Sequence, residues 1–224
     1  MKRFFTVLLV GCAALVCALP VNAQVTVKVD PSATWNGFMN VSELPSNGGG
    51  YVFGSGWGTA DLTAVFSGPV LTLGPNTIGD PASFWYTPSG GPGATGNKIM
   101  EANFYVEVTG PLSGVNLTFE GEVLSNTLTS AHTAIAFIKD FAPDYSSSVT
   151  TTVPLTPGPF SVSTFTIPAP GRHVQYGFQM VGPNVWITDV APFGNVQIGA
   201  IPEPTTLGLL GIAVTGVVAY RRRR

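Results

Sequence analysis

Cysteine is almost absent from this 224-residue chain: only Cys12 and Cys17 occur, both in an apolar N-terminal stretch that we expect to be removed. The remaining chain then has no cysteine, which excludes a disulfide framework and a cysteine nucleophile. Histidine is nearly as scarce, and His132 and His173 alone are too few for a zinc site by the usual rules. A folding unit of this length is stable without a disulfide or a metal, so its stability requires no cofactor.

Positive charge is scarce in the middle of the chain, because six of the ten basic residues lie at the two ends. Residues 24–200 carry four basic side chains against eleven acidic ones, a net charge of −7 that the whole-chain value of −2 conceals. Such a surface repels a phosphate backbone, so we expect no nucleic-acid partner.

Residues 1–23 have the three parts of a signal peptide. Lys2 and Arg3 supply positive charge, residues 4–19 form an apolar signal helix, and small residues end at Ala23, after which we expect cleavage. A permanent anchor is disfavoured, because the sixteen apolar residues are fewer than the roughly twenty of a membrane span. A lipoprotein signal at Cys12 is the other alternative, and it ranks lower because the apolar region ahead of Cys12 is very short.

Residues 201–224 form a second segment with three ordered parts. These are the motif Pro202, Glu203, Pro204 and Thr205, an apolar stretch at 206–220, and a basic cluster of Arg221, Arg222, Arg223 and Arg224. The apolar stretch predicts a transmembrane helix, and the arginines keep its end in the cytoplasm, so residues 24–200 lie outside. Its fifteen residues fall below the roughly seventeen of ordinary spans, which favours a helix that is held and then cut.

This tail resembles the PEP-CTERM sorting signal of Gram-negative bacteria. Ile201 is a mild departure from the usual Val-Pro-Glu-Pro start, whereas Thr205 fits the pattern. The resemblance implies that an exosortase, a membrane-embedded cysteine transpeptidase, recognises the chain and cleaves it near the motif. It also implies an intermediate held in the inner membrane, followed by delivery to the cell surface or to an extracellular polysaccharide matrix. A plain membrane anchor would give the same topology but would have no use for the Pro-Glu-Pro element.

Alternation of apolar and polar residues dominates the middle of the chain, most clearly at 100–108, 115–123 and 174–180. This period of two indicates half-buried antiparallel strands. Further strands are predicted at 25–29, 38–41, 51–53, 62–66, 70–73, 135–139, 148–153, 160–167, 185–187 and 196–198. Short strands separated by Gly- and Pro-rich turns predict one all-β domain over 24–200, a two-sheet sandwich of the jelly-roll type. Its general look resembles carbohydrate-binding jelly-roll modules.

No catalytic residues are predicted. Glu120 and Glu122 share one strand face, but two carboxylates side by side on a strand are more simply solvated than poised across a cleft. Asp140 and Asp144 flank a proline turn, and together they are a candidate pair of calcium ligands, although two acids in a polar turn are usually only solvated.

The four tryptophans and their aromatic neighbours are the remaining candidates for function. Trp85, followed by Tyr86, lies between turn signals and is the tryptophan most expected to be exposed, so the pair is a candidate platform on which a sugar ring stacks. The alternative is that large aromatic residues simply fill the core. We therefore predict an exported, non-enzymatic surface or matrix protein with a structural or adhesive role and polysaccharide as its partner. The alternative function is a secreted hydrolase acting on polysaccharide.

Overall fold

A computed structural model describes residues 23–201 of the chain. The predicted signal helix, the predicted transmembrane helix and the Pro-Glu-Pro motif lie outside these residues. Within them the protein is all-β: fourteen strands and four short 3-10 helices occur, and no α-helix. No helix in this part of the chain is long and apolar enough to cross a membrane.

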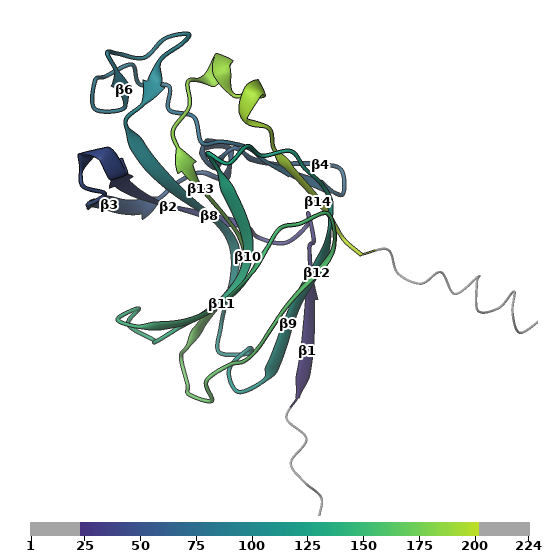
Figure 1. Cartoon of the computed structure of the whole chain (residues 1–224). Helices are drawn as coiled ribbons and strands as arrows, with labels where there is room; N and C mark the ends of the chain where they lie inside the picture. Colours follow the sequence, from purple (N-terminus) through teal and green to yellow (C-terminus); the bar gives the residue numbers. More distant parts are fainter. Residues whose placement is uncertain (1–22, 202–224) are drawn as a thin grey trace, which may run out of the picture.

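Two six-stranded sheets carry the fold (Figure 1). Sheet A runs in the order β1–β9–β14–β5–β4, and β12 also pairs with β9. Its strands are β1 (Gln24–Lys28), β4 (Ala64–Ser67), β5 (Val70–Leu73), β9 (Asn116–Asn126), β12 (Gly158–Phe165) and β14 (Val196–Gly199).

Sheet B runs in the order β11–β10–β13–β8–β2–β3, with every pair antiparallel. Its strands are β2 (Asn36–Glu43), β3 (Tyr51–Gly56), β8 (Lys98–Thr109), β10 (Thr133–Phe141), β11 (Ser148–Pro154) and β13 (His173–Pro183). A separate small ribbon pairs β6 (Tyr86–Thr87) with β7 (Thr95–Gly96).

The period-two pattern and the turn signals predicted the strands of the two sheets, because one face of each sheet packs on the other sheet, but they did not predict the β6–β7 ribbon. On β8, Met100, Ala102, Phe104 and Val106 are all buried, as their alternation predicts. One predicted strand is wrong: Val185 forms only an isolated bridge to Thr77, and a 3-10 helix follows at Ile187–Asp189. Three apolar residues in a row were too short a signal to distinguish a strand from a turn.

Aromatic side chains fill the space between the sheets. Trp35 stacks on Phe104 with ring centroids 4.4 Å apart and planes nearly parallel. Phe119 of β9 packs against Phe160 of the neighbouring strand β12 and against Phe178 of β13 in the opposite sheet. Burial of such large apolar surfaces is the main favourable contribution to the stability of the sandwich.

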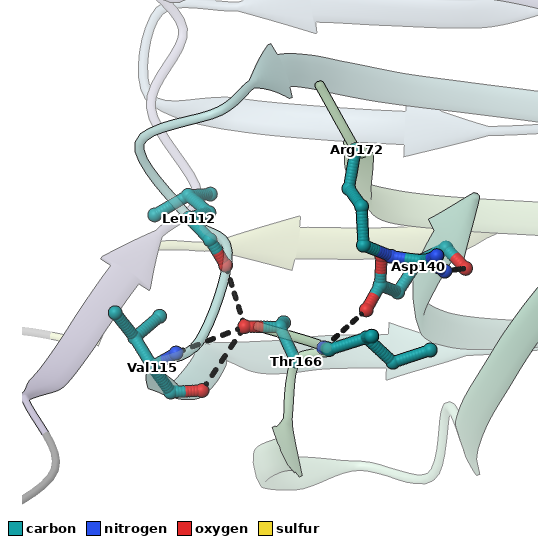
Figure 2. A network of polar contacts seen from close by, with 6 residues as sticks. Leu112, Val115, Asp140, Thr166 and Arg172 are labelled. Carbon is teal, nitrogen blue, oxygen red and sulfur yellow. Dashed lines mark hydrogen bonds and ion pairs between the residues drawn. The ribbon is translucent and has the colours of Figure 1, made fainter. Parts of the chain in front are cut away.

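A buried polar network ties the end of β10 to the start of β13 (Figure 2). Arg172 donates from Nε to Asp140 Oδ1 at 2.6 Å and from a terminal nitrogen to the Asp140 carbonyl oxygen at 2.9 Å. The second carboxylate oxygen of Asp140 accepts the backbone N–H of Ile167 at 2.7 Å. Next in sequence, the fully buried Thr166 hydroxyl donates to the Leu112 carbonyl oxygen and accepts the N–H of Val115. The network therefore anchors the connections that pass from one sheet to the other.

Sheet B curls away from sheet A, so that its outer face is concave (Figure 1). Strands β2, β8, β13 and β10 form the middle of this concave face, and β3 and β11 form its edges. The hairpin between β10 and β11 projects at one end of it. A concave, solvent-facing sheet is a place where a ligand can be held.

Candidate functional site: the concave face of sheet B

A cavity of about 600 Å³ lies on the concave face. Its lining combines four aromatic residues, four side-chain amides, one carboxylate and one ammonium group: Phe38, Tyr105, Phe141, Tyr145, Asn36, Asn40, Asn103, Gln175, Glu107 and Lys139. Aromatic surface with a few well-placed polar groups is typical of a small-molecule or sugar site.

Strand alternation brings these side chains together from four strands. On β8, residues 103, 105 and 107 point outward while their neighbours enter the core. The antiparallel register then sets Glu107 opposite Gln175 of β13, and Gln175 opposite Lys139 of β10. Asn103 lies opposite Phe38 of β2 in the same way. The cavity is thus a property of the sheet register rather than of any one segment.

Gly177 of β13 lies between two aromatic residues in the middle of sheet B. It pairs with Tyr105 on one side and with Phe137 on the other. A β-carbon at Gly177 would collide with the backbone of Phe104 and Tyr105, so the strands can approach this closely only with glycine. Two aromatic residues therefore flank a position that has no side chain.

Glu107 is the centre of the first polar cluster. Its Oε1 accepts the Tyr145 hydroxyl at 2.9 Å, and its Oε2 accepts the Gln175 side-chain amide at 2.7 Å. His173 Nδ1 lies 3.5 Å from the same carboxylate and 2.7 Å from the Thr109 hydroxyl. Desolvation, together with the hydrogen bond to Glu107, raises the pKa of Tyr145 to about 12, so its hydroxyl stays a donor at neutral pH.

Tyr145 belongs to the β10–β11 hairpin and adopts an uncommon backbone conformation. Its φ is +57°, in the left-handed region that a non-glycine residue occupies only when its surroundings fix it there. The ring stacks on His173 with centroids 4.3 Å apart and planes 15° apart. These contacts hold an aromatic wall at one end of the cavity.

Lys139 is the centre of the second polar cluster. Its ammonium group donates to Asn103 Oδ1 at 2.7 Å and lies 4.4 Å from the ring centroid of Phe137. Asn103 Oδ1 also accepts the Gln179 amide at 2.9 Å. Desolvation lowers the pKa of Lys139, with Glu101 acting in the opposite direction. Both charged groups that line the cavity, Lys139 and Glu107, therefore form hydrogen bonds to uncharged side chains.

Tyr86 does not have the exposure that a stacking platform requires, which corrects the expectation for this residue. Its side chain is 0% exposed, and its hydroxyl donates to the carbonyl oxygen of Ile78 at 2.7 Å. Trp85 is half-buried and packs edge-on against Phe84, with ring centroids 4.6 Å apart. Tyr86 packs against Trp186, whereas Trp85 packs against Phe53 and Phe84, so the two neighbours do not form one surface.

Asp140 and Asp144 have separate structural roles, which corrects their interpretation as a calcium pair. Both oxygens of Asp140 are committed to Arg172 and Ile167 in a buried network. Asp144 is exposed and accepts the N–H and hydroxyl of Ser146, which closes the hairpin turn and lowers the pKa of the carboxyl group. Within residues 23–201, no three His, Cys, Asp or Glu side chains gather as metal ligands.

The sequence contained one signal for the concave site, but many strands with a solvated polar face carry a similar signal. The polar face of 100–108 carries Glu101, Asn103, Tyr105 and Glu107, an unusual mixture of carboxylate, amide and aromatic groups. The other half of the site comes from strands up to 76 residues away, as with Gln179 and Asn103, and no spacing rule joins them.

The structure so far defines a class: a two-sheet β-sandwich with an aromatic and amide-rich concave face. Comparison with protein families identifies a sorting signal: the PEP-CTERM protein-sorting motif matches residues 200–224. This confirms the resemblance seen in the tail. A motif of this class implies export, processing by an exosortase and sorting to the cell surface of a Gram-negative bacterium. No curated protein and no solved structure matches the chain.

Proposed function

We propose that this exported protein is a non-enzymatic, adhesive component of the cell surface or extracellular matrix, and that its concave face binds polysaccharide. The observation that carries the proposal is the cavity itself, in which Phe38, Tyr105 and Tyr145 stand among side-chain amides. Aromatic rings stack on the apolar faces of sugar rings, and amides match neighbouring hydroxyl groups as both donors and acceptors.

The charge of the protein favours a neutral polysaccharide. Residues 24–200 carry a net charge of −7, which repels an anionic polymer. Glu107 and Lys139 are both engaged with uncharged partners inside the site. Neither is free to attract a strongly charged sugar without losing these bonds.

We propose further that the sandwich is a jelly roll, and the strand order supports this. Without β1 and β4, sheet A reads β5–β14–β9–β12, and without β2 and β3, sheet B reads β8–β13–β10–β11. From β8 onward, the chain crosses between the sheets at each step except for the β10–β11 hairpin. Two interleaved Greek keys have this order, and they are the basis of a jelly roll.

The positions of the carboxylates favour binding over hydrolysis. Glu101 and Glu107 are the two carboxylates of the concave face on β8, six residues apart. At about 3.3 Å per residue they are roughly 20 Å apart along the strand. Glycosidases place their two carboxyl groups about 5–10 Å apart. A secreted hydrolase is therefore the second candidate, and the only observation in its favour is that acidic groups lie near a cavity.

The test is retention on the polysaccharide of the bacterium that produces this protein. The polysaccharide is freed of protein and cast into a native gel, and the full chain in detergent micelles is run through that gel. We expect retardation that Tyr105→Leu abolishes, because leucine keeps apolar volume but has no ring to stack. Phe165→Ala, on the outer face of sheet A, is the matched control and should migrate like the unaltered protein. Absence of retardation would refute the proposal, and release of reducing sugar ends would favour the hydrolase.

A further inference from the structure

Tyr51 extends the concave site to the edge of sheet B. It is the most exposed large hydrophobic residue among those described, at 67% exposure, and it lies at the start of edge strand β3. It does not line the cavity of about 600 Å³, which ends at Phe38 and Asn40 of the neighbouring strand β2. Its position relative to those two residues decides whether it belongs to the site.

An irregular register turns Tyr51 onto the concave side. The β2–β3 pairing shifts between Val41 and Ser42, so that Val41 faces Phe53 and Ser42 faces Tyr51. One extra residue on β3 restores the outward orientation of Tyr51, on the side of Phe38 and Asn40. Without this bulge, strand alternation would place residues 51 and 53 on one face, and Phe53 packs against the core.

Gly54 shows where the ring of Tyr51 lies. A β-carbon at Gly54 would be 2.6 Å from the Tyr51 hydroxyl, 2.6 Å from Asn40 Oδ1 and 3.0 Å from the ring of Phe38. These three groups therefore converge over one glycine, whose missing side chain leaves room for them. Two of the three line the cavity, so Tyr51 continues its wall outward.

The exposed tyrosines stand at opposite ends of this surface. Tyr51 lies beside Asn40, which pairs with Glu101, whereas the Tyr145 hydroxyl bonds to Glu107. Since Glu101 and Glu107 are six residues apart on β8, the two ends are roughly 20 Å apart at about 3.3 Å per residue. That length exceeds one sugar ring several-fold.

We propose that the concave face is an extended groove for a glycan chain, bound along its length from Tyr145 to Tyr51, with Tyr51 as an outlying stacking residue that selects long chains over short ones. This inference rests on the proposed polysaccharide-binding function and adds the length of the ligand to it. A pocket for a single sugar or a chain end would have no use for an exposed ring at the sheet edge.

The experiment measures affinity against ligand length. The polysaccharide of the producing bacterium is partly hydrolysed and separated into disaccharides and hexasaccharides, and each is titrated calorimetrically into the full chain in detergent. We expect hexasaccharides to bind more tightly than disaccharides. Tyr51→Ala should weaken hexasaccharide binding roughly three- to tenfold, as the loss of one ring-stacking contact implies, and leave disaccharide binding unchanged.

Two variants control this result. Tyr51→Phe keeps the ring and should bind hexasaccharides like the unaltered protein. Phe165→Ala removes another exposed ring, from the outer face of sheet A, and should have no effect. The extended groove is refuted if Tyr51→Ala leaves hexasaccharide affinity unchanged, or if it weakens disaccharide binding to the same degree. Those results leave the central cavity intact as a binding site. Absence of binding by the unaltered protein to either fragment refutes the proposed function instead.

Discussion

Replacing Asp140 with Asn should destabilise the sandwich strongly, although the side chain is nearly the same size. The Asp140 and Arg172 side chains are only 3% and 9% exposed, so the change leaves a buried guanidinium without its counter-charge. Removing one partner of a buried ion pair costs about 3–5 kcal/mol. The lower end, about 3 kcal/mol, applies here, because the hydrogen bond from Arg172 to the Asp140 carbonyl oxygen survives the change.

That loss is large against the total stability of a domain, about 5–15 kcal/mol. At about 2–4 °C per kcal/mol for a protein of this size, the thermal midpoint should fall by about 6–12 °C. Thermal unfolding followed by circular dichroism at neutral pH measures the change. Asp144→Asn is the matched control, because this exposed carboxyl group contacts only Ser146, and its midpoint should stay almost unchanged.

A fall of less than about 1 kcal/mol for Asp140→Asn would refute this reasoning, since it would mean that water reaches and solvates Arg172. The double variant Asp140→Leu/Arg172→Leu sharpens the test. Once both charges are gone, the double variant should be more stable than Asp140→Asn, because no unpaired ion remains in the interior.

Two further predictions concern pH and sorting. Burial lowers the pKa of His132 below its ordinary value of 6.5, so near and below that pH the unfolded chain binds a proton that the folded protein does not. The free energy of unfolding should therefore be greatest above pH 6.5 and decrease as the pH falls below it. Urea titrations between about pH 7.5 and pH 5 should show a smaller decrease for His132→Phe than for the unaltered protein. Replacing Pro202, Glu203 and Pro204 with alanine should leave export intact but trap the full-length chain in the inner membrane, whereas mass spectrometry of surface material from the unaltered strain should find a C-terminus near the motif. Surface material that still ends at Arg224 would instead identify an ordinary anchor.

Strand alternation made most of the sheet architecture predictable. Because each strand packs one face on the core, the inward residues of β8, β9 and β13 were visible as a period of two. The same parity extends to Asp140, which follows Ala134, Ala136 and Ile138 on the inward face of β10. This parity indicates that Asp140 is not a surface ligand. The sequence did not reveal its partner, because Arg172 lies 32 residues further along the chain.

The sequence by itself determined what is read locally: the alternation that makes strands, and the tail at 200–224, whose recognition depends on linear order. Only the tertiary structure decided the binding surface, because the register of four strands brings Phe38, Tyr105, Lys139 and Gln175 to one cavity. The tertiary structure also decided which individual aromatic residues are buried and which are exposed. Tyr86 is buried and Tyr51 is exposed, a difference set by the loops that cover one and by a bulge at a sheet edge that turns the other outward.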